Sequence, residues 1–227
     1  MTNFIYITGV FSLIIQILTG TFNYYVLKLQ VPKSFELLRK LLQLEFIVQI
    51  IEGIFYIWMV YNFSKIDNIT HFRYYDWFIT TPTMLFTYSF YLLYLKYKEE
   101  NKEINDNIFK LIQENLKILL PVFILNSTML LFGYLGEIDI MSTQMAAFFG
   151  FIPFISMFYI IYKNYALFSQ TGINTFWYFS GIWSLYGVAS VLPYSIKNVI
   201  YNILDLFAKN FFGIFLAFEL FYANKKN

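Results

Sequence analysis

Apolar side chains dominate seven separate stretches of the chain, and short polar segments divide these stretches from one another. A membrane-spanning helix needs about 20 predominantly apolar residues, and each stretch is long enough. The predicted spans are residues 3–28, 35–62, 72–97, 109–136, 142–164, 172–195 and 197–223. Pro32, Gly136 and Gly172 mark breaks between spans, and the longest break is the mixed-charge run 96–106. The pattern predicts an all-α fold with a single domain, a seven-transmembrane helix bundle.

The composition agrees with lipid as the surrounding solvent. Hydrophobic residues make up 59% of the 227 residues and charged residues 13%, about half of the roughly 25% found in soluble domains. A net charge of +2 gives no reason to expect nucleic acid as a partner. The absence of cysteine excludes disulfides and thiol catalysis, and a single histidine argues against a metal centre. We expect an integral membrane protein in contact with the lipid bilayer, without enzymatic activity.

Positively charged residues predict the orientation of the bundle. Lysine and arginine gather on one side, at Lys28, Lys33, Arg39, Lys40, Lys96, Lys98, Lys102, Lys163, Lys225 and Lys226. The opposite side holds Lys65, Arg73 and Lys197. Because cytoplasmic loops carry the excess of positive charge, we expect the N-terminus outside and the C-terminus in the cytoplasm. The first span lacks a basic leader and a small-residue cleavage site, so we expect it to be retained.

Ionisable residues inside the spans need a role, because each costs at least ~2.5–3.5 kcal/mol at mid-bilayer. Lys209 lies in the middle of the seventh span, and Asp205 lies one helical turn before it on the same face. One interpretation is a buried salt bridge that fixes the helix. The other is a desolvated lysine amine that forms an imine with an aldehyde. The residues of this span alone leave both interpretations open.

The third span contains the string RYYDWFITTP at residues 73–82. This string closely resembles the R-Y-x-D-W-x-x-T-T-P signature of the microbial (type 1) rhodopsins. Later spans carry strings similar to those of the same family: M-x-x-x-G-x-x-G from Met129, MFYIIY from Met157, W-x-x-Y from Trp183 and D-x-x-x-K from Asp205. The resemblance covers five spans in the right order, and it is most noticeable to the viral and channelrhodopsin-like members.

This resemblance implies a cofactor, all-trans retinal, bound covalently to Lys209 as a protonated Schiff base. It also implies that Asp76 and Asp205 are the counterions and that Asp76 is the proton acceptor. The assignment is physically reasonable, because a buried cation is tolerated only beside carboxylates. Arg73 is expected to keep both aspartates ionised.

Further side chains are expected to support the counterions and to line the retinal pocket. Tyr186 would hydrogen-bond to Asp205. Thr80 would bond to Asp76 or, alternatively, to a carbonyl of its own helix. The expected pocket residues are Tyr74, Trp77, Thr81, Met84, Asn126, Met129, Gly133, Gly150, Pro153, Met157, Trp183 and Gly187.

Some pocket residues have specific expected roles. Trp77 and Trp183 would hold the polyene from either face. Thr81 would pair with Asn126 between the third and fourth spans, and Gly133 would leave room for the ring end of retinal. For Tyr74, Met157 and Pro153, simple helix packing is the alternative; otherwise Pro153 would touch the ring.

The resemblance leaves the type of activity open. In the family's proton pumps, a cytoplasmic proton donor stands 11 residues after the acceptor; here that residue is Thr87, which does not deprotonate at physiological pH. Glu45 and Glu52 stand two turns apart on one face of the second span and would form a row of cation sites. Channelrhodopsins are similar here, and they also have an asparagine at the position of Asn210. The alternative is one protonated glutamate, hydrogen-bonded between the second and seventh spans, without conduction.

We therefore expect a light-gated channel for monovalent cations or protons. The alternative is a light-driven outward proton pump, and a sensory function ranks third because the chain carries no long tail after the last span. The expected ion pathway comprises Ser12, Glu45, Glu52, Lys197, Asn202 and Asn210. Proton movement toward Asp76 would loosen contacts among Glu52, Asn210 and the Schiff base. Family members often form trimers or pentamers, and the sequence does not decide between a monomer and a homo-oligomer.

Overall fold

The computed structural model describes residues 2–102 and 107–225. These residues form α1 (Thr2–Leu27), α2 (Glu36–Asn62), α3 (Thr70–Glu99), α4 (Ile108–Glu137), α5 (Thr143–Asn164) and α6 (Gln170–Ser190). The seventh span consists of α7 (Tyr194–Asp205), a π-helical segment (Leu206–Asn210) and α8 (Phe211–Asn224). No strand occurs among the described residues. The prediction of an all-α bundle of seven helices is confirmed.

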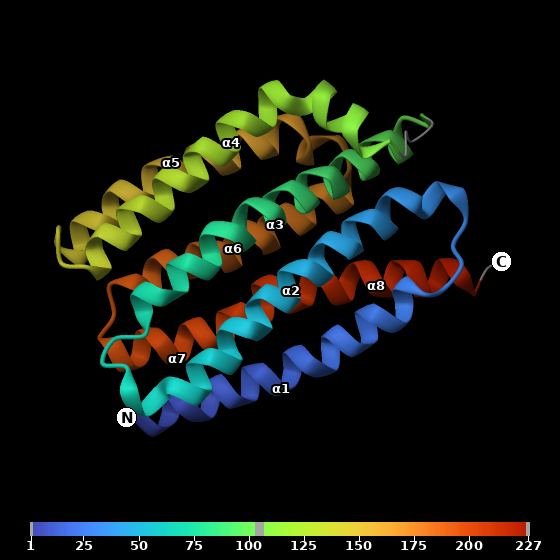
Figure 1. Cartoon of the computed structure of the whole chain (residues 1–227). Coiled ribbons are helices and arrows are strands. Elements are labelled where there is room, and N and C mark those ends of the chain that lie inside the picture. Colours follow the sequence, from blue (N-terminus) through green and yellow to red (C-terminus); the bar gives the residue numbers. More distant parts are fainter. Residues whose placement is uncertain (1, 103–106, 226–227) are drawn as a thin grey trace.

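The helices lie side by side at small angles, and the two chain ends are at opposite ends of the bundle (Figure 1). In this view α4 and α5 lie along one side and α1 with α2 along the other, while α3 and α6 run between them. α7 and α8 follow one another along the inside of α1 and α2. We call the end that holds the N-terminus the N-terminal side and the other end the C-terminal side.

The sixth predicted span is the one whose end differs most from the structure. The prediction extended it to residue 195, whereas α6 ends at Ser190 and α7 already begins at Tyr194. Pro193 explains the difference, because proline disfavours a helical conformation in the residue before it but suits the start of the next helix. Part of the predicted linker 96–106 is also helical, since α3 continues to Glu99; residues 103–106 lie outside the described residues.

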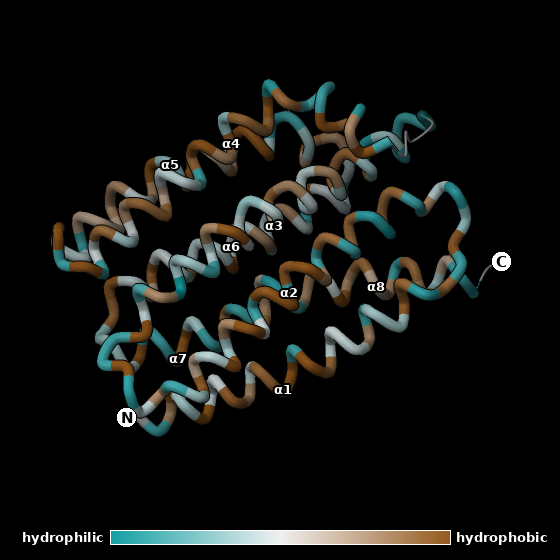
Figure 2. The backbone as a smooth tube through the Cα atoms, viewed as in Figure 1, coloured by the Kyte–Doolittle hydropathy of each residue, from teal (hydrophilic) through white to brown (hydrophobic). Residues whose placement is uncertain are grey.

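Large apolar side chains cover the outside of the bundle. Phe4, Ile54, Phe148 and Trp177 are each more than 60% exposed, which is favourable against lipid tails and costly in water. Figure 2 shows hydrophobic residues along the outer helices and hydrophilic residues at many of the connecting turns.

Among the described residues, four helices are long and apolar enough to span a membrane by length and composition alone: Asn3–Leu27, Lys33–Lys65, Ile108–Glu137 and Thr143–Phe168. Of the remaining spans, the third and seventh carry buried polar residues, among them Asp76 and Lys209, whereas the buried residues of α6 are apolar or glycine.

The interior of the bundle has an apolar part and a polar part. Between α3, α6 and α8 on the C-terminal side, aromatic rings fill the core: Tyr88 stacks on Phe179 with ring centroids 4.2 Å apart, and Phe212 packs edge-on against Tyr88. Between α1, α2 and the seventh span, buried side chains are largely polar. This division places the ionisable residues along one wall of the core.

Candidate functional site

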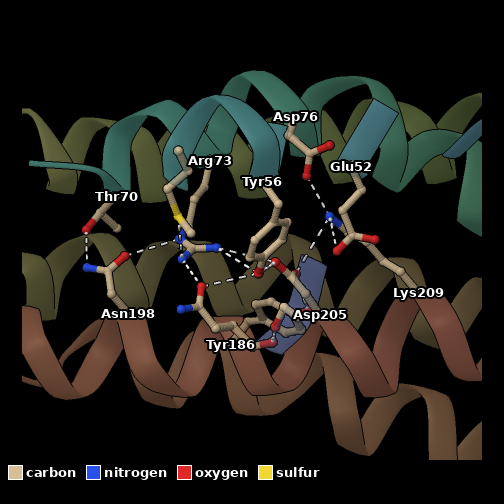
Figure 3. Close-up of polar contacts among 12 residues, drawn as sticks. Glu52, Tyr56, Thr70, Arg73, Asp76, Tyr186, Asn198, Asp205 and Lys209 are labelled. Carbon is tan, nitrogen blue, oxygen red and sulfur yellow. Dashed lines mark hydrogen bonds and ion pairs between the residues drawn. The ribbon is translucent and has the colours of Figure 1, made fainter. Parts of the chain in front are cut away.

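Lys209 lies at the centre of the bundle, where carboxyl groups from three helices surround its amine (Figure 3). Its Nζ donates to Asp76 Oδ2 of α3 at 2.5 Å, and it lies 3.5 Å from Glu52 Oε1 and 3.7 Å from Asp205 Oδ1. The Lys209 side chain is only 3% exposed. The structure therefore brings the two expected counterions to Lys209, and Glu52 of α2 lies beside Lys209 as expected.

The backbone at Lys209 departs from an α-helix. Residues Leu206–Asn210 form a π-helical turn, and the N–H of Phe211 donates to the carbonyl of Leu206, five residues earlier. Such turns are rare and occur mostly at functional sites. The sequence of this turn, LFAKN, contains neither proline nor glycine and gave no signal for it.

Asp205 is held by several donors on the N-terminal side of Lys209. Tyr186 donates to its Oδ1 at 2.7 Å, which is the expected bond. Tyr56 donates to its Oδ2 at 2.7 Å, and Arg73 Nη1 lies 3.3 Å from the same oxygen. The sequence analysis missed Tyr56, because one tyrosine among 20 carries no distinguishing signal.

Among the described residues, Arg73 forms an ion pair with Asp205 and none with Asp76, so the expectation that it helps to keep both aspartates ionised stays a prediction. Its fully buried side chain turns toward the N-terminal side, where it meets Asp205, Asn198 and Asn202 of α7. Asp76 receives no bond from it, and Asp76 Oδ1 has no hydrogen-bond partner among the described residues. The two aspartates are therefore held very differently.

The two threonines of the third span both bond to carbonyls of their own helix. Thr80 donates to the backbone carbonyl of Asp76 at 2.9 Å, so its expected support of the Asp76 carboxylate is wrong and the alternative holds. Thr81 donates to the Trp77 carbonyl at 2.7 Å and accepts from Asn126 Nδ2 at 2.9 Å, so the expected pair between α3 and α4 is present.

A cavity of about 110 Å³ adjoins Lys209 between α3, α4, α5 and α6. The expected residues that line it are Tyr74, Trp77, Thr81, Met84, Met129, Gly133, Gly150, Trp183, Tyr186, Gly187 and Lys209. Its walls are mostly apolar and aromatic, and Lys209 supplies an amine. The cavity suits a long apolar molecule attached to Lys209.

Three predicted pocket residues are not among those that line the cavity. Met157 is fully buried in the apolar core, Pro153 is also buried within α5, and Asn126 lies behind Thr81. Several residues that do line it were not predicted, among them Phe151 and Phe154 of α5. The sequence does not show how each helix is rotated about its own axis. It therefore does not distinguish which of several neighbouring apolar residues face the cavity.

Gly133 lies at a close approach between α3 and α4. A Cβ atom there would be 2.5 Å from the Tyr74 hydroxyl, which is closer than packed atoms come. The glycine therefore accommodates Tyr74, while it also lines the cavity. This result refines the expectation that Gly133 makes room for the cofactor alone.

A column of buried polar side chains runs past Lys209 between α1, α2 and the seventh span. On the N-terminal side, Ser12 donates to the carbonyl of Asn202 at 2.7 Å. On the C-terminal side, Gln49 donates to Asn210 Oδ1 at 2.6 Å and accepts from Asn23 Nδ2 at 3.0 Å. The residues of this polar column are Ser12, Gln16, Thr19, Asn23, Glu45, Gln49, Glu52, Asn202 and Asn210.

Two residues of the expected ion pathway are placed differently from the prediction. Asn210 bonds to Gln49 and Thr19, so the expected contact with Glu52 is not formed. Lys197 donates to Glu137 of α4 at 2.7 Å and 2.9 Å, away from the column. Adjacent residues of an α-helix point about 100° apart. Asn198 therefore faces Arg73, while Lys197 faces Glu137 of α4.

Comparisons with known proteins agree with this geometry. The crystal structure of the viral rhodopsin OLPVRII is similar with 28% identity and a TM-score of 0.81, over 96% of this chain and 97% of that one. A blue light-absorbing proteorhodopsin from Med12 (20% identity, TM-score 0.75, 98% and 99% covered) shares the fold. Xanthorhodopsin, described as a light-driven ion pump with dual chromophore, also shares the fold, with 18% identity and a TM-score of 0.72 over 99% of this chain and 94% of that one. A search of curated protein sequences finds no match.

The family comparison covers almost the whole chain. Residues 3–222 match the family described as "Bacteriorhodopsin-like protein". The match includes the buried lysine, its carboxyl partners and the residues that line the adjoining cavity. With a seven-helix bundle built around these groups, the chain belongs to the bacteriorhodopsin-like family.

Proposed function

We propose that this protein is a light-gated cation channel that carries retinal on Lys209. Members of its family bind retinal, and the apolar cavity beside Lys209 offers a place for that molecule. Trp77 and Trp183 line an apolar space that ends at a buried amine, and the adjacent carboxyls would balance a positive charge on that amine. When bound to Lys209 as a protonated Schiff base, all-trans retinal supplies isomerisation driven by light.

Asp76 is the residue that would accept a proton from Lys209 Nζ. It is the nearest carboxyl, at 2.5 Å, and its Oδ1 is free of other hydrogen bonds. Asp205 is a poorer acceptor because two tyrosine hydroxyls and Arg73 already stabilise its charge. Proton transfer to Asp76 neutralises the pair that holds Lys209 in place, so the contact between Lys209 and Glu52 weakens.

The polar column is the observation that carries the channel proposal. Burying a polar group without a partner costs free energy, yet several column residues have buried polar atoms without one: Gln16, Asn23, Glu45, Glu52 and Asn210. These residues lie on one wall and extend from α1 across α2 to the seventh span. Such a lining suits a path that fills with water and cations when the helices separate.

The path is closed on the N-terminal side. Arg73 fills the space between α3 and α7 and bonds to Asn202, which also accepts a bond from Tyr56 at 3.2 Å. Asn202 in turn donates to α1, at the carbonyl of Ile5 and the hydroxyl of Thr8. This network joins four helices, so it forms the constriction that has to open for conduction.

A light-driven outward proton pump is the second candidate. It is favoured by the short Lys209–Asp76 contact, since the first proton transfer is the same in both functions. The two candidates differ in whether ions then move down their gradient or a proton moves in one direction only.

Photocurrents under voltage clamp, in cells supplied with retinal, test the proposal. For a channel, the current reverses sign as the membrane voltage is changed, because the ions follow their electrochemical gradient. A current that stays outward at all voltages contradicts the channel and supports the pump.

The same recordings on Glu52→Gln locate the pathway. Loss of one carboxyl beside Lys209 is expected to change the reversal potential or to reduce the current several-fold, since Glu52 is a fully buried member of the polar column. Glu114→Gln, at an exposed residue of α4, is the matched control and is expected to behave like the unmodified protein. Unchanged currents in Glu52→Gln would remove this residue from the pathway.

A further inference from the structure

Three lysines lie where the end of α8 meets the connection between α1 and α2, and Figure 1 shows these two segments next to one another. Asn224, the last residue of α8, donates from its Nδ2 to the carbonyl of Gln30 at 2.6 Å. Lys225 directly follows Asn224 in the sequence. Lys28 and Lys33 lie two residues before and three residues after Gln30. The hydrogen bond therefore gathers these three lysines, the lysine cluster, at one corner of the C-terminal side.

The lysine cluster carries positive charge without a carboxylate partner among the described residues. All three lysines are exposed, and none takes part in an ion pair in this part of the chain. The acids that are nearest in sequence have other neighbours. Glu36 pairs with Arg39 at 2.9 Å, and Glu219 of α8 is close to Tyr91 of α3. The cluster is therefore a local excess of positive charge.

Aromatic rings position two of the three ammonium groups. Lys28 Nζ lies 4.2 Å from the centroid of the Tyr24 ring, and Lys225 Nζ lies 4.6 Å from the centroid of the Phe221 ring. A ring attracts the cation but takes none of its three hydrogen bonds along an ordinary acceptor direction. Both ammonium groups can therefore donate to an anion while they stay over their rings.

Next to the cluster, further into the membrane, α1 and α8 present exposed aromatic side chains. Phe22 of α1 packs on Phe218 of α8 with ring centroids 5.3 Å apart, and Phe218 stacks on Tyr222. Tyr25, Phe218 and Tyr222 are 54%, 45% and 59% exposed. Such a surface is favourable against acyl chains, and tyrosine is suited to the depth of the lipid headgroups. We call this surface the α1–α8 seam.

We propose that the lysine cluster and the α1–α8 seam together bind an anionic phospholipid. Its phosphate accepts hydrogen bonds from the lysine ammonium groups, and its acyl chains lie along the aromatic side chains of the seam. A zwitterionic lipid has the same chains, but its headgroup adds a cation beside the lysines. Free phosphate has the charge but no chains. The inference depends neither on retinal nor on conduction.

Native mass spectrometry of the purified protein tests the site. The protein is released from micelles that contain equal amounts of phosphatidylglycerol and phosphatidylcholine with the same acyl chains. Because each lysine near an anionic lipid strengthens binding roughly 5-fold, the unmodified protein should retain phosphatidylglycerol at least roughly 10-fold more often. The cluster variant, Lys28→Gln with Lys33→Gln and Lys225→Gln, should lose this preference. Equal retention of both lipids by the unmodified protein would overturn the proposal.

The matched control removes three exposed lysines on the same side but outside the cluster, as Lys98→Gln with Lys102→Gln and Lys163→Gln. It has the same net charge as the cluster variant. It therefore separates a specific site from the general attraction between a positive surface and anionic lipids. The control should keep the preference of the unmodified protein. An equal loss in both triple variants would show general attraction only and would contradict a site.

Two further arms identify the source of the phosphate and the role of the seam. Excess inorganic phosphate should leave the lipid bound, because it lacks acyl chains; displacement of the lipid would show a site for free phosphate instead. Tyr25→Ser with Tyr222→Ser should lower retention of both lipids. Tyr61→Ser with Tyr159→Ser, at tyrosines that are 77% and 61% exposed elsewhere, is the control. Equal retention by the two tyrosine variants would remove the seam from the site.

Discussion

At the scale of single residues, the two aspartates near Lys209 have different surroundings. Asp205 accepts from Tyr186, Tyr56 and Arg73, whereas Asp76 contacts Lys209 and has one oxygen without a partner. Hydrogen bonds stabilise a carboxylate against protonation. Asp205 is thus suited to remain a charge and Asp76 to change its charge. This difference is consistent with Asp76 as the proton acceptor.

Replacing the lysine tests the attachment of retinal. In Lys209→Ala no amine remains at the end of the cavity, so the protein supplied with retinal should lack its visible absorption band. Lys209→Arg is the informative control, because it keeps a positive charge among the carboxyls but cannot form the imine. If the lysine served only as a salt bridge, both variants would keep the band. A band of full strength in either variant therefore contradicts the assignment.

At the scale of elements, an ion pair ties α4 to α7 at the N-terminal end of the cavity. Lys197 donates to both oxygens of Glu137, and the two side chains are 9% and 6% exposed. Glu137 also lines the cavity. The pair was not predicted, because the residues are 60 positions apart and neither belongs to a motif.

Breaking this pair is expected to destabilise the bundle. Glu137→Gln leaves Lys197 without its charged partner, and the expected loss is roughly 1–3 kcal/mol of unfolding free energy. Thermal unfolding of the pigment in lipid nanodiscs, followed by the visible band, measures the change. The double variant Glu137→Leu with Lys197→Met removes both charges and should recover most of the loss. Equal stability of Glu137→Gln and the unmodified protein would show that the pair contributes little.

At the scale of the whole molecule, the positive residues on the C-terminal side predict that this side is cytoplasmic. The absence of cysteine makes the prediction easy to test, because any introduced cysteine is the only thiol in the chain. In intact cells, a membrane-impermeant maleimide should label Asp67→Cys, in the connection between α2 and α3. It should label Lys98→Cys, near the end of α3, only after the cells are permeabilised. The reverse pattern would invert the bundle and with it the direction of proton or cation movement.

The sequence alone determined the number of spans, the bundle and the central chemistry. Seven apolar stretches can satisfy their backbone hydrogen bonds in lipid only as helices, so no tertiary information was needed for the fold class. The spacing of Asp205 and Lys209 placed both on one helix face. The resemblance of the string around Asp76 to the rhodopsin signature predicted Asp76 as a second carboxyl at Lys209.

Only the tertiary structure decided how the helices are rotated against one another. It turned Arg73 to Asp205 and paired Lys197 with Glu137. It also joined Glu45 to Thr87, which are 42 positions apart. Local sequence does not encode such pairs of residues, because each pair depends on the rotation, tilt and depth of two helices. Packing of the whole bundle sets these quantities.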